Sequence, residues 1–291
     1  MWRVWVPATL ANLGSGFDAL GVALALDLAI EAELAQRDEF IYQGQGEVPE
    51  GTNNLIHQGY RAYFADLGIS PPPVAIKADN PIPMARGMGS SSAALVAGIA
   101  LADLVSGRRA GPDQIFKLAA RLEGHPDNVA PAVYGGFVLA LADPPIAVPL
   151  PAPPDLVFVL GVPSYGVLTQ KAREVLPKQV PLADACFNLA RAALWPAALC
   201  SGRLELLREA SHDSLHQSYR ASLYPGAQEA IRALEKHGAL AAFVGGAGPT
   251  LAGLALEAKA DSLALILSEY SGPGGNTMKL AVGGGYRWKE V

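Results

Sequence analysis

The hydrophobic and polar positions along the chain follow two different periods. Residues 2–6 alternate as a strand does, and the apolar run of residues 22–34 is also typical of a strand. Between residues 55 and 67 apolar side chains recur at helical spacing, with Thr52 as the expected N-cap and Gly68 as the expected end. The N-terminal part is therefore predicted to begin as sheet and to continue with a helix.

The rest of the chain mixes strands and helices in the same way. Residues 143–155 hold a dense set of prolines and follow neither period, which predicts a linker. The order of elements predicts an α+β protein of two domains, residues 1–148 and residues 149–291. Strands are expected near residues 74–78, 156–162, 240–244 and 278–282, and helices near residues 90–107, 112–122, 169–176, 182–199, 204–211, 226–237 and 260–270.

Composition and charge narrow the class of protein. The 291 residues are 51% hydrophobic, which is enough for two ordinary cores, and they include no long apolar segment of the kind that enters a membrane. With 22 basic and 27 acidic residues the formal net charge is −5, and no basic cluster is present, so nucleic acid is not an expected partner. We expect a cytoplasmic protein whose two cysteines, Cys186 and Cys200, are buried thiols.

The most informative stretch is Pro-Met-Ala-Arg-Gly-Met-Gly-Ser-Ser-Ser-Ala-Ala, residues 83–94. Gly87 and Gly89 permit positive φ and a close approach to a ligand, while the helix predicted to begin near Ser90 directs unpaired N–H groups at that ligand. The helix dipole adds an attraction for anions. A tight turn before a Ser-capped helix is the simpler alternative, but three serines after the glycines favour phosphate binding. The stretch matches neither a P-loop nor a dinucleotide-binding fingerprint.

Three stretches together resemble the motifs of the GHMP kinases, a family of small-molecule kinases. Residues 83–91 are similar to the family's Pro-x-x-x-Gly-Leu-Gly-Ser-Ser loop, with Met88 in place of leucine, and residues 7–18 and 245–250 are similar to its first and third motifs. The resemblance covers nearly the whole chain. It implies an N-terminal domain like the second domain of ribosomal protein S5, a ferredoxin-like C-terminal domain, an active site between them, ATP with Mg²⁺, and a homodimer.

Other segments resemble the members of the family that phosphorylate the side-chain hydroxyl of L-homoserine to O-phospho-L-homoserine, a step toward threonine. These segments are residues 11–18, 125–131, 169–173 and 216–220. Arg173 and Arg220 suit an α-carboxylate, because guanidinium groups bind it in bidentate geometry, and Asp18 suits an α-ammonium group. Taken alone, a lone arginine is more often a solvated charge, and Asn12 and Asp18 are as often turn formers.

The resemblance also implies a role for each site residue. Many family members have a carboxylate where Asn128 stands, and an amide accepts no proton at neutral pH. The catalytic residues implied, Asn128 and Arg173, would therefore act by positioning and charge stabilisation. Substrate contacts are implied for Asn12, Asp18, His125, Asn128, Thr169, Arg173, Arg220 and Gly248, and nucleotide contacts for Pro83, Met84, Ala85, Arg86, Gly87, Met88, Gly89, Ser90, Ser91, Ser92 and Ala93, with Asn53 either lining that site or capping the helix.

The implied magnesium ligands are Ser91, Ser92 and Glu123. Magnesium bridges phosphate oxygens and disperses their charge, so it is expected with ATP. Many relatives supply a helical glutamate as ligand, but Lys117 stands about where that residue is expected. Glu123 is the nearest substitute.

Three other functions remain open from the sequence. His212 and His216 stand at i, i+4 spacing as in a zinc hydrolase, although Asp213 is shorter than the glutamate base which that motif needs, and no third ligand is evident. A nucleotide-binding regulator without catalysis is a second alternative, against which the nearly complete motif set argues. A mevalonate-pathway or sugar kinase is the third, and it would not be expected to keep Arg173 and Arg220 in these contexts.

Overall fold

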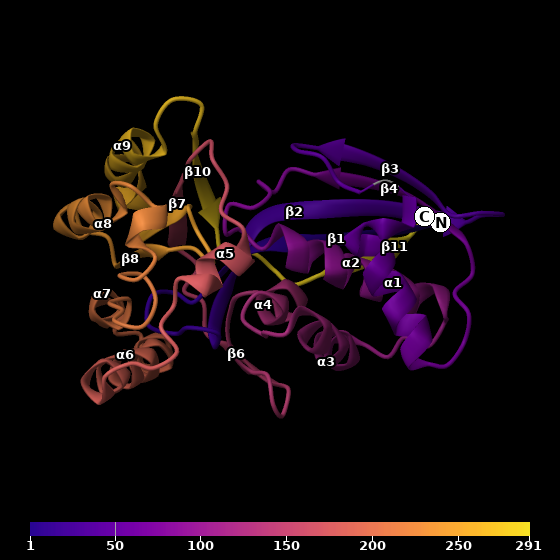
Figure 1. Cartoon of the computed structure of the whole chain (residues 1–291), viewed down its shortest axis with the longest axis horizontal. Helices are drawn as coiled ribbons and strands as arrows, with labels where there is room; N and C mark the ends of the chain where they lie inside the picture. The colour runs from indigo at the N-terminus through magenta and orange to yellow at the C-terminus, as the bar shows by residue number, and fades with distance from the viewer. Residues whose placement is uncertain (50) are drawn as a thin grey trace.

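The computed structural model describes residues 1–49 and 51–291, and it places two sheets side by side (Figure 1). The larger sheet has the order β11-β1-β2-β4-β3, with β5 beside β2 and β6 beside β5. All its strands pair antiparallel except β3 and β4. The strands are β1 (Trp2–Ala11), β2 (Leu20–Leu34), β3 (Glu39–Gly44), β4 (Val74–Asn80), β5 (Phe137–Leu141), β6 (Ile146–Leu150) and β11 (Arg287–Glu290).

Four helices accompany this sheet. The central helix α2 is almost entirely apolar, so it is buried on nearly all sides, as expected for a helix inside a core. It packs on β1, and α1 and α3 pack against it in turn. The helices are α1 (Leu55–Asp66), α2 (Ser90–Val105), α3 (Pro112–Glu123) and α4 (Val129–Tyr134), and a short 3₁₀ helix, η1 (Gly51–Asn53), precedes α1.

The smaller sheet has four antiparallel strands in the order β10-β7-β9-β8. Counted along the chain, this order is fourth, first, third, second, and with its two helical connections it forms the β-α-β-β-α-β pattern called ferredoxin-like. Its strands are β7 (Leu156–Val162), β8 (Ala241–Val244), β9 (Leu251–Leu256) and β10 (Asn276–Ala281). Its helices are α5 (Thr169–Glu174), α6 (Leu182–Ser201), α7 (Leu207–Ala210), α8 (Ala227–Lys236) and α9 (Ala260–Ser271), with the 3₁₀ helices η2 (Leu204–Leu206), η3 (Ala221–Leu223) and η4 (Glu257–Lys259).

Strand β7 explains why the two halves share one core. Every residue of β7 is buried, and its side chains alternate between two faces. Phe158 and Leu160 join the main core, which also contains Trp195 of α6, while Val157 and Val159 pack with the smaller cluster beneath α8 and α9. The indole of Trp195 contacts Phe137 of the first sheet and Phe243 of the second.

Several expectations from the sequence are corrected. The N-cap of α1 is Asn54, whose side chain accepts from the His57 N–H, and not Thr52. Part of the expected linker at residues 143–155 is strand β6, because residues 146–150 pair antiparallel with β5. Cys186 and Cys200 are free but exposed on α6, not buried.

Two segments that follow the N-terminal half in sequence, β6 and β11, belong to the larger sheet. Strand β11 returns to the first sheet and pairs with β1, so residues 287–290 lie with the N-terminal part. The proposed boundary at 148/149 falls within β6, which also belongs to that sheet. The boundary remains a prediction.

Among the described residues, no helix combines the length and apolar character needed to cross a membrane.

The glycine-rich loop before α2 is held by backbone hydrogen bonds from both parts of the chain. The Thr9 N–H donates to the Met88 carbonyl at 3.1 Å, and the Val167 N–H donates to the Ala85 carbonyl at 2.9 Å. Gly87 and Gly89 have φ of 73° and 68°, which confirms the positive φ expected from the sequence. A Cβ at Gly87 would lie 2.0 Å from the Gly245 carbonyl oxygen. Only glycine permits this approach.

We predict that Gly89→Ala destabilises the protein more than Gly202→Ala. The two glycines have similar backbone angles, 68° and 21° for Gly89 and 72° and 11° for Gly202. A Cβ at Gly89 would lie 2.0 Å from Thr9 Oγ1, whereas nothing lies within 4 Å of one at Gly202. Both variants lose about 1 kcal/mol to the left-handed backbone, and Gly89→Ala loses a further ~1–3 kcal/mol to overpacking. Urea unfolding measures both, and equal losses would contradict this account of the loop.

Candidate active site

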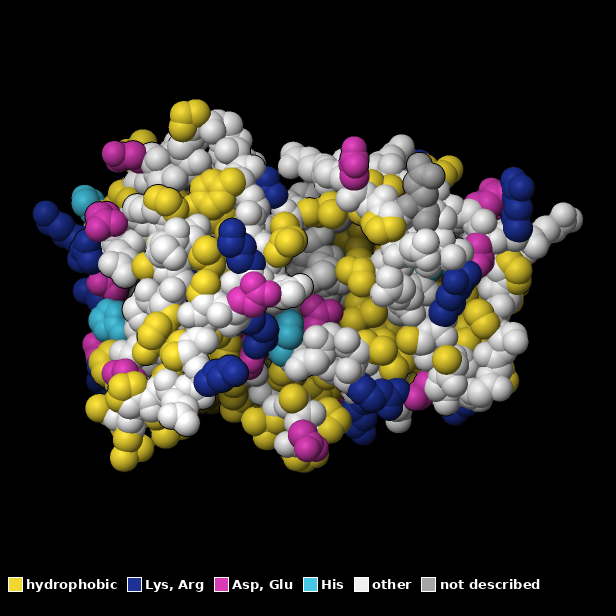
Figure 2. Space-filling model, viewed as in Figure 1, with side chains coloured by type: hydrophobic (Ala, Val, Ile, Leu, Met, Phe, Trp, Pro, Cys, Tyr) yellow, Lys and Arg dark blue, Asp and Glu magenta, His cyan; other side chains and the backbone are white. Residues whose placement is uncertain are grey.

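A cavity of about 310 Å³ lies between the two parts of the chain, and its lining comes from both. Figure 2 shows the molecule hollowed at this place, with hydrophobic side chains along the hollow. The cavity brings together most of the residues singled out from the sequence: Asn12, Asp18, Pro83, Met84, Ala85, Gly87, Met88, Gly89, Ser90, Ser91, Glu123, His125, Asn128, Thr169, Arg173 and Arg220. Asn53, Arg86, Ser92, Ala93 and Gly248 are not part of the lining.

The first turn of α2 forms the middle of the cavity. Helix α2 begins at Ser90, as expected, with Gly89 as its N-cap and no side-chain cap. The first N–H groups of a helix have no partners within it, and they carry the positive end of the helix dipole. Asn80 at the end of β4 donates from Nδ2 to the Ser90 hydroxyl at 3.1 Å. This end of the helix therefore offers backbone donors and a dipole suited to an anion.

Arg86 fixes the loop to the second domain. Its guanidinium donates to the backbone carbonyls of Met84, Pro163 and Ser164. Arg86 does not line the cavity. Its contacts instead hold the loop in position across the domain interface. A direct phosphate contact for Arg86 stays a prediction.

Glu123 and two serines of α2 form a cluster of oxygen atoms beside the loop. The Ser92 hydroxyl donates to Glu123 Oε1 at 2.8 Å, and the Ser91 hydroxyl lies 3.4 Å from the same oxygen. Glu123 is the last residue of α3, which packs on α2. Carboxylate and hydroxyl oxygens are ligands that Mg²⁺ accepts, usually with phosphate oxygens and water completing the set. The residues thus fit a magnesium ion held jointly with phosphate.

Asn128 lies next to the loop, and Thr9 sets its orientation. The buried Thr9 hydroxyl donates to Asn128 Oδ1 at 2.8 Å. Because this bond occupies the amide oxygen, the Nδ2 group of Asn128 remains to donate into the cavity. The side chain is therefore placed as a hydrogen-bond donor, in agreement with an amide that does not act as a base.

Asp18 and Arg173 form an ion pair at the far end of the cavity. The two guanidinium nitrogens of Arg173 donate to the two Asp18 oxygens at 3.0 and 2.7 Å, and this bond raises the pKa of Arg173. Asn12 supports the turn that carries Asp18, since its Oδ1 accepts from the Asp18 N–H at 3.1 Å and its Nδ2 donates to the Gly246 carbonyl at 3.0 Å. Asn12 is thus a turn former that also lines the cavity.

Arg220 is a buried cation whose contacts are all with uncharged groups. The residue is only 2% exposed, and its Nε donates to the Ala172 carbonyl at 2.8 Å. Nη1 faces His216 Nδ1 at 3.3 Å and the Gly246 carbonyl at 3.5 Å. Burial lowers the pKa of Arg220. Across the described residues no carboxylate forms an ion pair with it, so a positive charge faces the cavity without a counterion.

His125 lines the same cavity and is paired with Asp127. The His125 Nδ1 lies 2.8 Å from Asp127 Oδ1, and Asp127 is buried. Burial alone would lower the pKa of His125, but the hydrogen bond and the charge of Asp127 outweigh it, so the pKa is raised. The Asp127 carboxylate therefore favours the protonated form of this imidazole and pairs with it.

The zinc-like His-x-x-x-His spacing does not produce a pair of ligands. Residues 212–216 form no helix, so the i, i+4 spacing does not place the two rings on one face. His212 Nε2 pairs with Glu235 at 2.9 Å, whereas His216 Nε2 contacts the Gly14 carbonyl at 2.8 Å. Within residues 1–49 and 51–291, no group of three or more His, Cys, Asp or Glu side chains is arranged to hold a metal ion.

Sequence reasoning missed the opposite end of the cavity. There the lining is apolar and aromatic, as in many sites for flat ring systems. Asn54 could have been found, since an asparagine two residues from an expected helix start is a cap signal. Other lining residues lie inside the stretches singled out from the sequence but were given no role there: Ala11, Phe17, Ala94, Asp127, Gly246 and Ala247. The rest carry no motif and meet only through folding: Leu28, Phe40, Tyr42, Val48, Pro49, Leu55, Ile56, Asn80, Val167 and Leu168.

Known proteins are similar to this chain over its whole length. A homoserine kinase of Thermus thermophilus is 64% identical over 289 residues, covering 99% of each chain, and one of Moorella thermoacetica is 44% identical over 252 residues, covering 85% of each. A homoserine kinase of Cytophaga hutchinsonii with a crystal structure superposes with a TM-score of 0.89 at 27% identity, covering 99% of this chain and 96% of that one.

Two family models match the two halves. The model of the GHMP kinase N-terminal domain matches residues 54–136, and that of the C-terminal domain matches residues 197–271. Together with the superposition, they confirm the two-domain α+β fold that the sequence predicts. The glycine-rich loop before α2, the acidic and basic residues of the cavity and these likenesses lead to one conclusion: the chain is a kinase that belongs to the GHMP kinase family.

Proposed function

We propose that this kinase transfers the γ-phosphate of ATP to the side-chain hydroxyl of L-homoserine, giving O-phospho-L-homoserine in the route to threonine. The substrate assignment rests on Arg220, a buried cation without a carboxylate partner among the described residues. The same cavity also contains the Asp18–Arg173 ion pair. An amino-acid substrate supplies both the missing anion and a cation for Asp18. The relatives named homoserine kinase support the same choice.

The substrate carboxylate binds Arg220 in this proposal. A desolvated guanidinium gains most from a planar carboxylate, which it meets with parallel N–H donors. Arg173 stands on the same side of the cavity, and both arginines lie over the ring of Phe17, with their Cζ atoms 5.6 and 5.3 Å from its centroid. The α-carboxylate would be shared between them.

The α-ammonium group binds Asp18. Before substrate enters, Asp18 is neutralised by Arg173, so the cavity is not left with an isolated negative charge. An ammonium group arriving at Asp18 and a carboxylate arriving at Arg173 match the two halves of this ion pair. Thr169 and His125, which also line the cavity, complete the proposed acceptor site, and Gly248 supports it through the turn after β8.

ATP occupies the middle and the apolar end of the cavity. Its phosphates meet the backbone N–H groups of residues 87–91 at the start of α2, where the helix dipole favours anions. Its base meets the aromatic end, near Phe40 and Tyr42. This arrangement directs the γ-phosphate toward the acceptor end.

Transfer requires mainly alignment of the two substrates. The homoserine oxygen forms a bond to the γ-phosphorus while the bond to the oxygen bridging to ADP breaks, with little covalent help needed from the protein. Asn128, held by Thr9, donates from Nδ2 to the transferring group, and Arg173 adds positive charge near it. The proposed catalytic residues therefore orient and stabilise, and the hydroxyl proton passes to an oxygen of the transferred phosphoryl group rather than to either side chain.

Magnesium would be held by Glu123 with the hydroxyls of Ser91 and Ser92. Both hydroxyls contact Glu123 Oε1, which gathers hard oxygen ligands next to the proposed phosphate site. When bound, the ion neutralises charge on the phosphate oxygens. The chain's part is to fix these oxygens on two packed helices, α2 and α3.

We further propose a cytoplasmic homodimer. The outward side of α6 is unusually apolar for a solvent-facing helix, with Leu182 and Leu189 exposed at 79% and 70%. Patches of this kind usually mark contact with another protein. A second copy of the chain is the proposed occupant.

The substrate assignment is tested by measuring ADP release with L-homoserine, mevalonate, galactose, shikimate and L-threonine as acceptors. We expect homoserine to be far ahead, because the charges at Asp18 and Arg220 match an α-amino acid and the threonine side chain places its hydroxyl one carbon closer. A preference for mevalonate or galactose would overturn the assignment.

We predict that Arg220→Ala lowers kcat/KM for homoserine by about two orders of magnitude, as expected for one partner of a desolvated charge pair. Arg220→Lys should recover only part, because a point charge lacks the planar fork. The KM for ATP should stay nearly unchanged. The exposed Arg232, paired with Glu229, is the matched control, and Arg232→Ala should leave both substrates unaffected. Loss of ATP binding in Arg220→Ala would place this arginine in the wrong half of the cavity.

We predict that Glu123→Gln raises the magnesium concentration needed for half-maximal activity about tenfold, since the change removes the ligand charge but keeps the side-chain size. The measurement is a magnesium titration at fixed ATP. Glu174→Gln, on an exposed turn of α5, is the control and should leave the titration curve in place. An unchanged curve in Glu123→Gln would remove Glu123 from the magnesium site.

A further inference from the structure

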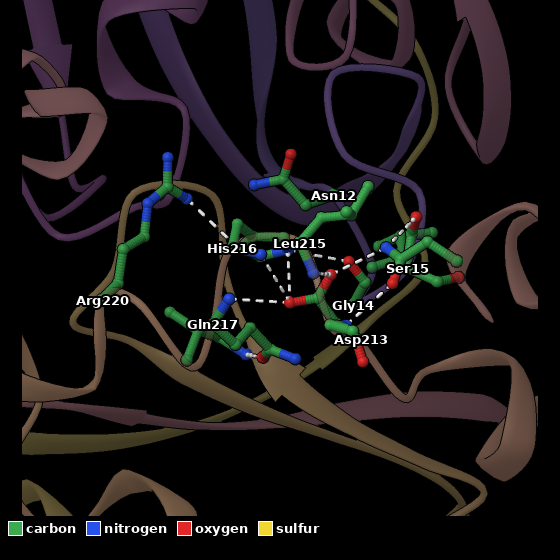
Figure 3. A network of polar contacts seen from close by, with 12 residues as sticks. Asn12, Gly14, Ser15, Asp213, Leu215, His216, Gln217 and Arg220 are labelled. Carbon is green, nitrogen blue, oxygen red and sulfur yellow. Dashed lines mark hydrogen bonds and ion pairs between the residues drawn. The ribbon is translucent and has the colours of Figure 1, made fainter. Parts of the chain in front are cut away.

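Arg220 follows an irregular segment of the chain, so its orientation needs an explanation. Residues 213–220 form turns rather than a helix or strand. An arginine side chain has four rotatable bonds, and fixing them costs entropy that local contacts must offset. Figure 3 shows that this segment is nevertheless held by a network of polar contacts around Asp213 and His216.

Asp213 fixes the backbone on which His216 stands. Its buried carboxylate accepts from the backbone N–H groups of Leu215, His216 and Gln217 at 2.7–3.0 Å, and from Asn188 of α6 at 2.8 Å. The Asp213 carboxylate accepts from backbone N–H groups that would otherwise pair with carbonyls in a helix or sheet. The segment is therefore rigid despite its irregular form.

His216 connects this segment to both sides of the substrate cavity. Its fully buried ring has Nε2 at 2.8 Å from the Gly14 carbonyl and Nδ1 at 3.3 Å from Arg220 Nη1. Gly14 lies in the same turn as Asn12 and Asp18. The ring also stacks on Phe17 at 5.2 Å.

These two neighbours allow only one form of the imidazole. A carbonyl oxygen can only accept, so Nε2 carries the proton, and an arginine can only donate, so Nδ1 is bare. A second proton would turn Nδ1 into a donor facing the Arg220 guanidinium. Burial lowers the pKa of His216, and the Arg220 charge acts in the same direction, against the opposite pull of Asp213 and Asp18.

We propose that neutral His216 is a positioning residue for the acceptor site, which holds Arg220 by accepting from Nη1 and ties it to the Gly14 turn by donating from Nε2. This inference rests on the proposed function of Arg220. With Nε bound to the Ala172 carbonyl and Nη1 to His216, the Nη2 group, for which no described residue serves as acceptor, is left for the substrate carboxylate. The relay sets the distance between the groups for the carboxylate and the ammonium.

Two variants separate positioning from packing. His216→Phe keeps an aromatic ring against Phe17 but removes both polar contacts. His216→Gln keeps one acceptor and one donor without the ring. If His216 positions Arg220, the KM for homoserine rises about tenfold in His216→Phe, because one hydrogen bond to a charged group is lost. In His216→Gln the KM rises less, because one acceptor and one donor remain.

The KM for ATP serves as the internal control and should change less than twofold in both variants. A residue that only stabilises the fold would change both KM values together, or neither, and the order Gln better than Phe would be reversed. Either pattern would overturn the proposal. Circular dichroism and urea unfolding of both variants identify any loss that comes from misfolding.

A second measurement does not depend on the substrate. Nitrogen NMR of the ligand-free protein labelled at histidine should show His216 as the neutral form with the proton on Nε2 at pH 7. A proton on Nδ1, or a doubly protonated ring, would contradict the relay. If this tautomer is found but homoserine is not phosphorylated, the proposed function fails while the contact to Arg220 stands.

Discussion

The structure depends on the close approach of two glycine-containing turns, one from each domain. The loop before α2 and the turn after β8 meet so closely that a Cβ at Gly87 would overlap the Gly245 carbonyl, and the Gly246 N–H donates to the Ala11 carbonyl at 3.2 Å. This contact joins the two domains beside the cavity, whose lining includes both the start of α2 and the charged groups at residues 18, 173 and 220.

The two arginines that line the cavity have different surroundings. Arg173 is partly exposed and neutralised by Asp18, so it can exchange partners at little cost. Arg220 is buried and relies on carbonyl and imidazole groups, which orient it but do not cancel its charge. A buried charge without a counterion is unfavourable for folding, so this arrangement is typical of a site that a ligand completes.

The sequence was sufficient to predict the local parts of this architecture. Period signals located β7, and the spacing of Gly87, Gly89 and Ser90 located the positive-φ turn and the start of α2, because these features depend on neighbours in the chain. The short strands β3, β5 and β6 were missed, since their weak patterns acquire meaning only when a partner strand is present. The contact between His216 and Gly14 joins residues 202 positions apart, and the Asp18–Arg173 pair joins residues 155 positions apart. Such contacts follow from packing and have no local signal.

The pairing of β1 with β11 has a consequence for the order of folding. Trp2 lies opposite Glu290, so β1 is synthesised long before β11, the strand that covers one of its edges. Contacts between such distant positions form slowly, and an open strand edge is a place where other chains can attach. During synthesis this edge of β1 therefore stays uncovered until the smaller domain has emerged and β11 follows it.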